Sequence, residues 1–305
     1  MIKRVEIQNF RCIRQATIDL GALTVLVGPN ACGKTTVLAA INPGHGLNPS
    51  DAWMKQPNSS ILVQVTYSNR TATRRIDSGN WVANEFAHSF QLLHLDVDRL
   101  RSPNQVAHES TLSADGHNLA NVFGTLTRKQ QAAVADELCR LVPVFSDLDL
   151  VPIQQGTHTL RFQDRWDSNV WYLPNEVSDG TMLIVAFLMV QHQRSRPDIV
   201  AIEEPDRGLH PYLVSQVVAL LRKLSVGEVG NGKAIQILLA THSAELLDYV
   251  QPEEVRFLSR DRATGALQVY QVDPASPDWK AAYDEYRESL GSVWLSGGLG
   301  GVPGE

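Results

Sequence analysis

The apolar run LTVLV at residues 23 to 27 limits the possible folds of this chain more than any other feature. A continuous apolar run of this length is typical of a central strand whose two faces are both buried. The glycine-rich turn GPNACG follows it, and a helical pattern then begins with KTTVLAA. A strand that passes through such a turn into a helix is a building unit of parallel α/β sheets. We therefore expect a parallel sheet that contains residues 23 to 27 as a central strand.

The turn matches the phosphate-binding pattern G-x-x-x-x-G-K-[ST], the P-loop, in the strand-to-helix context that the pattern requires. Gly28 and Gly33 allow the backbone to curl so that successive N–H groups and the helix N-terminus face the phosphates of a nucleotide. Lys34 is expected to reach the β and γ phosphates, Thr35 to bind Mg²⁺ and Thr36 to contact the α phosphate. An ordinary glycine-rich turn is the alternative.

Two other residues of interest lie inside this loop. Asn30 is expected to help bind the nucleotide. Cys32 either fills space as a small side chain or makes the site sensitive to oxidation. With Cys12 and Cys139 it forms a set of three widely separated cysteines without metal-ligand spacing. This usage suits a reducing cytoplasm and argues against a disulfide framework or a zinc site.

A P-loop needs a second strand that ends in an acidic residue, and the segment DIVAIEE at residues 198 to 204 supplies two. Glu203 would coordinate the metal directly or through water, and Glu204 would polarise the water that attacks the γ phosphate. A salt-bridged structural pair is the alternative. A further apolar strand ends at Thr241 and His242, where the histidine can donate a hydrogen bond to the γ phosphate.

The remaining elements suggest how the chain is organised. Strand patterns at residues 2 to 7, 16 to 20, 61 to 68, 71 to 77 and 89 to 95 indicate a mixed β lobe, and helical spacing appears within residues 99 to 147. Alternating strands and helices from 148 onward indicate a largely parallel sheet covered on both faces. We expect a β lobe with the P-loop over residues 1 to 98 and a helical insertion over residues 99 to 147. The second half of the ATPase core should follow over residues 148 to 290, and a flexible glycine-rich tail over residues 291 to 305.

Composition excludes some classes of protein. The chain has 305 residues, a net charge of -6 and 43% hydrophobic residues, so nothing in its overall charge indicates a nucleic-acid or membrane binder. The most apolar stretch, residues 181 to 190, is about half the length needed to span a bilayer, and it is expected to be a buried helix. Short basic clusters at residues 70 to 77, 99 to 101 and 259 to 262 could contact nucleic-acid phosphates, although such runs are usually solvated surface.

The order of these motifs resembles that of an ABC-class ATPase over nearly the whole chain. In that class a Ser-x-Gly signature at a helix N-terminus binds the γ phosphate held by the opposite subunit, and here Ser178 and Gly180 fall on it. A simple helix N-cap is the alternative for Ser178. The resemblance implies an α/β fold, namely a P-loop ATPase head of the ABC type. It also implies a homodimer with two ATP molecules between the subunits, in which Asp206 lies in a loop that crosses the interface.

Within this class the chain is similar to the branch that contains RecF, the structural-maintenance-of-chromosomes (SMC) heads and the overcoming-lysogenisation-defect (OLD) family. The segments IQNFRCIRQATIDL, IEEPDRGLHP and SADGHNLA carry this resemblance. Arg11 falls on the N-F-R motif of the branch, where it either approaches the nucleotide, braces the P-loop or is a plain surface arginine. The usual glutamine of the sensor loop is missing, and Asp96 or Asp98 could replace it.

The resemblance implies a cytoplasmic ATPase that uses ATP and Mg²⁺ and acts as a dimerising switch. OLD proteins continue into a nuclease domain, whereas this sequence has only about 33 residues beyond its last hairpin, so a separately encoded effector is expected, in phage defence or DNA maintenance. Two other functions remain open: the nucleotide-binding subunit of a transporter, and a scaffold that binds ATP without hydrolysing it.

Overall fold

The computed structural model describes residues 1–55, 60–77, 80–83, 86, 88–229, 232–286 and 289–297. The chain forms two compact units. The first consists of Met1–Gln91, Pro197–Asp206 and Ala234–Glu305, and the second of Leu92–Arg196 and Arg207–Lys233.

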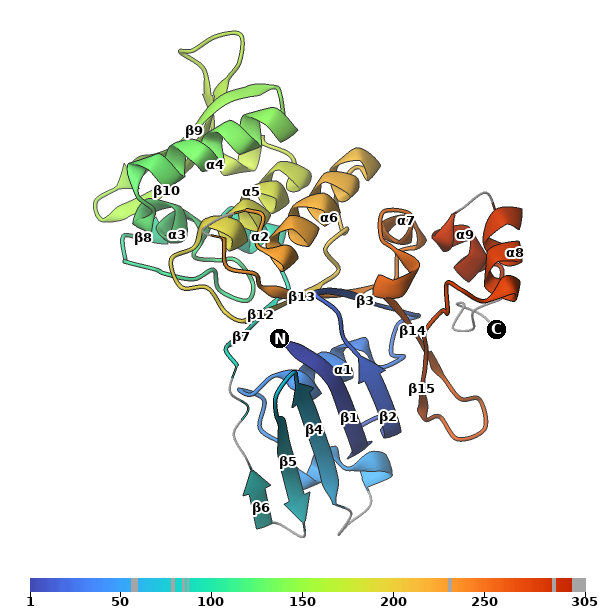
Figure 1. The fold of residues 1–305 in the computed structure, drawn as a ribbon. Helices are drawn as coiled ribbons and strands as arrows, with labels where there is room; N and C mark the ends of the chain where they lie inside the picture. The colour runs from blue at the N-terminus through green and yellow to red at the C-terminus, as the bar shows by residue number, and fades with distance from the viewer. Residues whose placement is uncertain are drawn as a thin grey trace. The chain divides into compact units, whose positions relative to one another are not determined.

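The first unit contains an antiparallel sheet, which Figure 1 shows as neighbouring blue and teal arrows. Its strand order is β2-β1-β4-β5-β6. The strands are β1 (Ile2–Phe10), β2 (Ile13–Asp19), β4 (Ile61–Tyr67), β5 (Thr71–Asp77) and β6 (Asn80–Ala83). Alternate residues of β4 are buried from Ile61 to Val65, as expected for a strand with one face on the core. This sheet contains four of the five strands predicted for the β lobe, whereas the fifth, predicted at residues 89 to 95, is β7 (Phe90–Leu93) of the other sheet.

The first unit also contributes most of a second, largely parallel sheet with the order β15-β14-β3-β13-β12-β7. Its strands are β3 (Leu23–Val27), β7 (Phe90–Leu93), β12 (Ile199–Glu203), β13 (Gln236–Thr241), β14 (Val255–Arg260) and β15 (Leu267–Tyr270). All five residues of β3 are buried, and β3 pairs in parallel with β13 and β14. The apolar run at residues 23 to 27 is therefore a central strand, as predicted.

A buried glutamine ties the two sheets of the first unit together. The side chain of Gln236 accepts a hydrogen bond from the N–H of Ile2 and donates to the carbonyl oxygens of Ile2 and Gly21, each at 2.8 Å. Because its amide is 1% exposed and makes all three bonds, it holds the start of β1 against β13 without leaving a buried polar group unpaired.

The helices of the first unit are α1 (Lys34–Ile41), α7 (Ala244–Leu247), α8 (Pro277–Glu285) and α9 (Leu290–Leu295), with single 3-10 turns at Pro49–Asp51, Trp53–Lys55 and Pro252–Glu254. Two of these helices, α1 and α7, follow the parallel strands β3 and β13, and the other two come after β15. The predicted flexible tail from residue 291 is wrong at its start, because α9 occupies that position and Trp294 is buried there at 1% exposure. The rest of the predicted tail, residues 298–305, lies outside the described residues.

The second unit combines helices with a small antiparallel sheet. Its helices are α2 (Val97–Leu100), α3 (Leu119–Thr125), α4 (Arg128–Leu141), α5 (Asp179–His192) and α6 (Pro211–Val226), with a 3-10 turn at Pro174–Glu176. Its strands are β8 (Asn104–Gln105), β9 (Phe145–Gln154), β10 (Thr157–Asp164) and β11 (Trp171–Tyr172). Every residue of α5 from Gly180 to Gln191 is buried, so the predicted buried helix is present.

The compact units differ from the predicted domain boundaries. Helices α3 and α4 fall within residues 99–147 as predicted, but they share a unit with α5 and α6 and with the strands from β8 to β11. The predicted insertion is thus part of a larger unit, because the apolar face of α4 packs against both β9 and α5. In the part of the chain that the structure describes, no helix has both the length and the apolar character that a bilayer crossing requires.

Candidate nucleotide site

The P-loop connects β3 to α1, and both of its predicted glycines sit where a side chain would not fit. A Cβ on Gly28 would lie 2.2 Å from the carbonyl oxygen of Leu258 in β14. Gly33 has a φ of 124° and would bring a Cβ to 2.8 Å from the Sγ of Cys12. Gly28 therefore permits close packing on a neighbouring strand, whereas Gly33 permits a backbone conformation that other residues rarely adopt.

Lys34, the predicted phosphate ligand, lies over the loop that precedes it. Its Nζ donates to the carbonyl oxygens of Gly28 at 2.7 Å and Pro29 at 3.0 Å. Asn30 and Thr36 belong to the same loop and the first turn of α1, and Asn30 is exposed. The P-loop backbone thus keeps the ammonium group beside the N-terminus of α1, where an anion would bind.

The two residues predicted to bind a metal lie in contact. The hydroxyl of Thr35, in the first turn of α1, donates a hydrogen bond to Oε1 of Glu203 at the end of β12. The parallel register explains this proximity, because Glu203 pairs with Ala240 of β13 and the next residue of β13, Thr241, pairs with Val27 of β3. The carboxyl ends of the three strands therefore meet at one edge of the sheet, which is where α/β proteins bind ligands.

Glu204 and His242 form a second pair at the same edge. The Nδ1 of His242 lies 3.3 Å from Oε1 of Glu204, and the N–H of Glu204 donates to the carbonyl oxygen of Ala240 at 2.8 Å. Glu204 has a φ of 49°, a left-handed conformation that costs a non-glycine residue about 1–3 kcal/mol. Backbone strain of this kind is concentrated at functional sites, and here it occurs at the residue whose carboxylate lies beside His242.

Asp206, which the resemblance places at a dimer interface, is bonded within its own unit. Its Oδ1 accepts a hydrogen bond from the hydroxyl of Thr241 at 2.8 Å, and the same hydroxyl accepts from the N–H of Ser243 at 2.9 Å. This chain of bonds links the segment after β12 to the turn that carries His242. The structure thus supplies a connection between the two catalytic candidates that sequence patterns did not indicate.

Arg11 braces a neighbouring loop and lines a cavity of about 490 Å³. Its Nε donates to Oδ1 of Asp51 at 3.0 Å, and one terminal nitrogen lies 3.0 Å from Nε2 of His45. Burial, followed by the nearby charge of Arg11, lowers the pKa of His45 and so favours its neutral form. Cys12, which lies against Gly33 of the P-loop, also lines this cavity, so Arg11 supports the region beside the P-loop, and its contact with a nucleotide stays a prediction.

Cys32 is packed inside the P-loop. Its side chain is 1% exposed, and its Sγ lies 2.8 Å from the position that a Cβ on Gly28 would take. Burial raises the pKa of the Cys32 thiol, which reduces the reactive thiolate, although the charge of Lys34 opposes this. The geometry favours a packing role.

Ser178 and Gly180 lie at the N-terminus of α5 in the second unit, as predicted. The hydroxyl of Ser178 accepts a hydrogen bond from the N–H of Thr181 at 3.2 Å, so it caps the helix. Gly180 is buried, and a Cβ there would meet the carbonyl oxygen of Gly208 at 3.5 Å. In the same unit Asp96 caps α2 by accepting hydrogen bonds from the N–H groups of Asp98 and Arg99.

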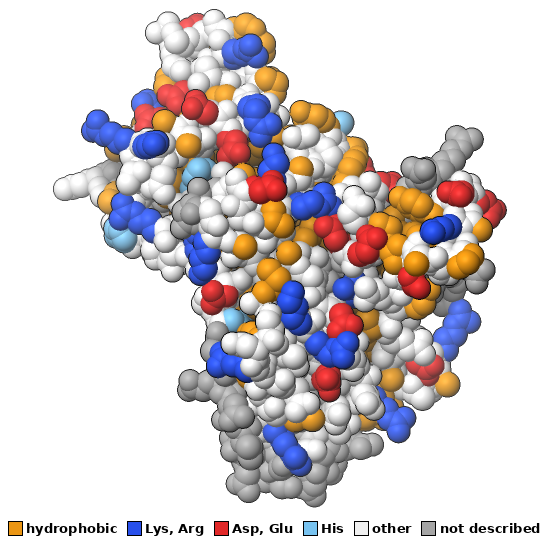
Figure 2. All heavy atoms as spheres, in the orientation of Figure 1, with side chains coloured by type: hydrophobic (Ala, Val, Ile, Leu, Met, Phe, Trp, Pro, Cys, Tyr) orange, Lys and Arg blue, Asp and Glu red, His pale blue; other side chains and the backbone are white. Residues whose placement is uncertain are grey.

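The basic clusters contain arginines that are used internally. Arg74 is 6% exposed and donates to the carbonyl oxygens of Asn42 and His45, and Arg101 donates to three acceptors around the start of α5. On the face drawn in Figure 2, Lys and Arg side chains are scattered among Asp and Glu. Membership of a basic cluster in the sequence is therefore a poor guide to a phosphate-binding surface here.

The donors present fit a magnesium ion held mainly by a nucleotide. Among the described residues, no group of three or more His, Cys, Asp or Glu side chains could hold a metal ion. Mg²⁺ in nucleotide sites usually has only one or two protein ligands, the rest being phosphate oxygens and water. The hydroxyl of Thr35 and the carboxylate of Glu203 meet that requirement.

Comparison with known families agrees with this geometry. Residues 1–44 match a family model described as "AAA ATPase domain". Residues 44–248, more than half of the chain, match the model described as "AAA domain, putative AbiEii toxin, Type IV TA system". The chain belongs to this AAA family.

Solved structures with the same fold as this AAA-family protein include SMC heads. An SMC head bound to the C-winged helix domain of ScpA has a TM-score of 0.63 and 13% sequence identity, covering 90% of this chain and 98% of that one. The SMC head domain from Thermotoga maritima has a TM-score of 0.57 and 14% identity, covering 89% and 99% of the two chains. The predicted fold, a P-loop ATPase head of the ABC type, is confirmed.

Two curated relatives are considerably longer than this AAA-family protein. An OLD nuclease of Thermus scotoductus is 39% identical over 77 residues, 25% of this chain and 13% of the relative. A Streptomyces avermitilis protein named "Putative ABC transporter ATP-binding protein" is 26% identical over 245 residues, 80% of this chain and 33% of the relative. The chain thus spans a minor part of each relative. The AAA family match, the OLD relative and the SMC-head fold support the predicted resemblance to P-loop ATPases of the SMC-, RecF- and OLD-like branch.

Proposed function

We propose that this AAA-family protein hydrolyses ATP at the edge of its parallel sheet. The observation that carries the proposal is the meeting of two pairs there, Thr35 with Glu203 and Glu204 with His242. Lys34 and the P-loop N–H groups would bind the β and γ phosphates. Thr35 and Glu203 would hold Mg²⁺, which offsets the charge that develops on the phosphate oxygens.

Glu204 is the residue proposed to orient the attacking water. Its carboxylate accepts a hydrogen bond from that water and takes its proton as the water oxygen attacks the γ phosphorus, and the proton then passes to the departing phosphate. The bond to the β–γ bridging oxygen breaks, and ADP and phosphate leave. His242, 3.3 Å from Glu204, holds that carboxylate in place and is positioned to donate to the γ phosphate.

We further propose that two copies of the chain close around two ATP molecules. Ser178 and Gly180 stand at the N-terminus of α5, a 14-residue helix whose N-terminus favours an anion. In this proposal that end meets the γ phosphate held by the partner copy, with Mg²⁺ present. ATP then stabilises the dimer and hydrolysis releases it, because only the ATP-bound state makes this contact.

The proposed role of the dimer is to switch a separately encoded effector on or off. The relationship to an OLD nuclease and the description of the matching AAA family are consistent with an effector used against phage or in DNA maintenance. Co-purification of the tagged chain with the product of a neighbouring gene would identify the effector.

The hydrolysis step is tested by comparing Glu204→Gln with Glu253→Gln. Glu204→Gln should lose nearly all ATP hydrolysis, because the amide cannot take part in proton transfer as the carboxylate does. Glu253→Gln changes an exposed glutamate in a 3-10 turn and should leave the rate unchanged. Hydrolysis by Glu204→Gln at the rate of the unsubstituted chain would show that Glu204 is wrongly assigned.

The name of the Streptomyces avermitilis relative favours a second function, that of a transporter's nucleotide-binding subunit. This function would need the same ATP site but a membrane partner. Isolation of the chain in a stable complex with an integral membrane protein would support it over the effector switch. A third function, an ATP-gated scaffold, requires dimerisation with ATP and no turnover that depends on Glu204.

A further inference from the structure

We propose that Arg101 is a positioning residue for the signature segment, holding residues 174–179 so that the N-terminus of α5 can accept a phosphate. This inference rests on the proposed ATP-dependent dimer. Arg101 belongs to the basic cluster at residues 99 to 101 and does not lie in any motif of the site. Its role follows from its contacts alone.

The guanidinium of Arg101 joins three acceptors ahead of and within the first turn of α5. Its Nε donates to the carbonyl oxygen of Pro174 at 3.0 Å. One terminal nitrogen donates to the carbonyl oxygen of Val177 at 2.9 Å and to Oδ1 of Asp179 at 2.8 Å. Val177 and Asp179 flank Ser178, so these bonds fix the backbone on both sides of the predicted phosphate ligand. A planar guanidinium supplies several donors in a rigid arrangement, which a lysine ammonium does not.

Arg101 also offsets a charge that would oppose phosphate binding. Asp179 is the first residue of α5, and its side chain is 58% exposed. A carboxylate at a helix N-terminus competes with any other anion for the positive end of the helix dipole. The side chain of Arg101 is 18% exposed and bonded to this carboxylate, so it neutralises the charge that an incoming triphosphate would otherwise meet.

The SADGHNLA segment, residues 113 to 120, holds the short helix that carries Arg101. The N–H groups of His94 and Asp96 donate to the carbonyl oxygens of Ala114 and Asp115 at 2.8 and 3.1 Å. Gly116 has a φ of 81°, and a Cβ there would lie 2.3 Å from a methyl group of Leu100. The segment therefore packs directly on α2, one residue before Arg101.

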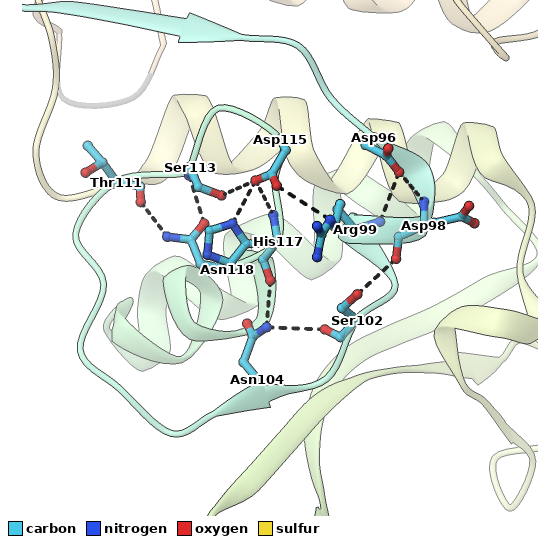
Figure 3. A network of polar contacts seen from close by, with 10 residues as sticks. All are labelled: Asp96, Asp98, Arg99, Ser102, Asn104, Thr111, Ser113, Asp115, His117 and Asn118. Atoms are coloured by element: carbon cyan, nitrogen blue, oxygen red, sulfur yellow. Dashed lines mark hydrogen bonds and ion pairs between the residues drawn. The ribbon is translucent and has the colours of Figure 1, made fainter.

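Polar side chains close this segment on itself, as Figure 3 shows. Oδ1 of Asp115 accepts hydrogen bonds from the hydroxyl of Ser113 at 3.0 Å and from Nδ1 of His117 at 2.7 Å. Partial burial raises the pKa of Asp115, but these bonds and one from the N–H of His117 outweigh it and hold the pKa at about 2. Asn118 adds bonds to the N–H of Ser113 and the carbonyl oxygen of Thr111. These bonds hold the turn that packs against α2.

The test measures ATP-dependent dimerisation in the Glu204→Gln background, by sedimentation at several protein concentrations. Arg101→Ala should weaken dimer association at least tenfold, while the affinity of the monomer for fluorescent ATP stays within twofold. The double variant that carries both Arg101→Ala and Asp179→Asn should associate several-fold more tightly than Arg101→Ala alone, because it no longer has the carboxylate that lost its partner. Arg128→Ala is the matched control, since Arg128 is an exposed arginine at the start of α4, and it should have no effect.

Arg101→Lys guards against a folding defect, because it keeps the charge and most of the side chain. It should dimerise several-fold more weakly than the Glu204→Gln protein, which is the parent of these variants, since one ammonium cannot donate to all three acceptors. The inference is overturned if Arg101→Ala dimerises as tightly as the parent, if Asp179→Asn gives no recovery, or if Lys replaces Arg without loss. Failure of the parent itself to dimerise with ATP would instead reject the proposed dimer, and this inference with it.

Discussion

Replacement of Gly28 by alanine tests how the P-loop is held in place. The Cβ would lie 2.2 Å from the carbonyl oxygen of Leu258 and 2.8 Å from the Sγ of Cys32. Leu258 and Cys32 are 0% and 1% exposed, so neither can move into solvent. The closer contact, at 2.2 Å, is well below the 3.4 Å at which ordinary van der Waals contact begins, and it involves a backbone atom of β14.

The expected cost follows from these contacts. Overpacking a rigid core typically costs about 1–3 kcal/mol, and the contact with backbone places Gly28→Ala near the upper end. About 3 kcal/mol corresponds to a more than 100-fold change in the unfolding equilibrium. Relief of the clash requires the P-loop to move away from β14, so ATP affinity should fall as well.

Urea unfolding measures the effect, with Gly46→Ala as the control. A Cβ on Gly46 would have no atom within 4 Å, and the φ of Gly46 is not left-handed, so alanine should be tolerated there. Gly28→Ala should lower the midpoint of unfolding with little change in the slope. Equal midpoints for the two variants would refute this explanation of Gly28.

Three further predictions concern single side chains. Thr35→Val should reduce Mg²⁺-supported turnover about 10- to 100-fold while Thr35→Ser preserves it, which a Mg²⁺ titration of the hydrolysis rate would test. His242→Ala should slow hydrolysis roughly 100-fold and leave the affinity for ATP unchanged. Single-turnover kinetics would measure the first effect, and equilibrium binding of ATP would measure the second. Asp115→Asn should destabilise the fold at pH 6, because hydrogen bonds outweigh burial and hold the Asp115 pKa at about 2, below its ordinary 3.8. This stabilisation is present above pH 3.8 and is lost as the pH falls towards 2, so the difference in unfolding midpoint should close over that range; a constant difference would contradict the prediction.

The sequence predicted the parallel core well because its signals are local. Residues 23 to 27 form a buried strand, and the glycine spacing and Lys34 mark the turn that follows. The proximity of Thr35 and Glu203 was also predictable, since parallel strands bring their carboxyl ends to one edge. The strand β13 was also predicted, but its position between β3 and β12 became evident only from the strand pairing.

The features that were missed depend on contacts between distant residues. Arg101 reaches acceptors 73 to 78 residues away, and its sequence neighbours suggested only a basic cluster. Helix α9 was predicted as part of a tail because glycines dominate its surroundings, whereas burial of Trp294 stabilises it. The left-handed conformation of Glu204 was also unforeseen, since a glutamate gives no indication of a positive φ.

The mass of the Glu204→Gln protein in solution with Mg²⁺ and ATP tests the proposed ATP-driven dimer most directly. Light scattering should show the 33.7 kDa chain shifting to twice that mass when ATP is added, and returning to a monomer when ATP is removed. The same protein carrying Lys34→Ala should remain a monomer, because it cannot hold the phosphates. A monomer at saturating ATP, or a dimer whose mass does not depend on nucleotide, would contradict the proposal that ATP joins two copies of this chain.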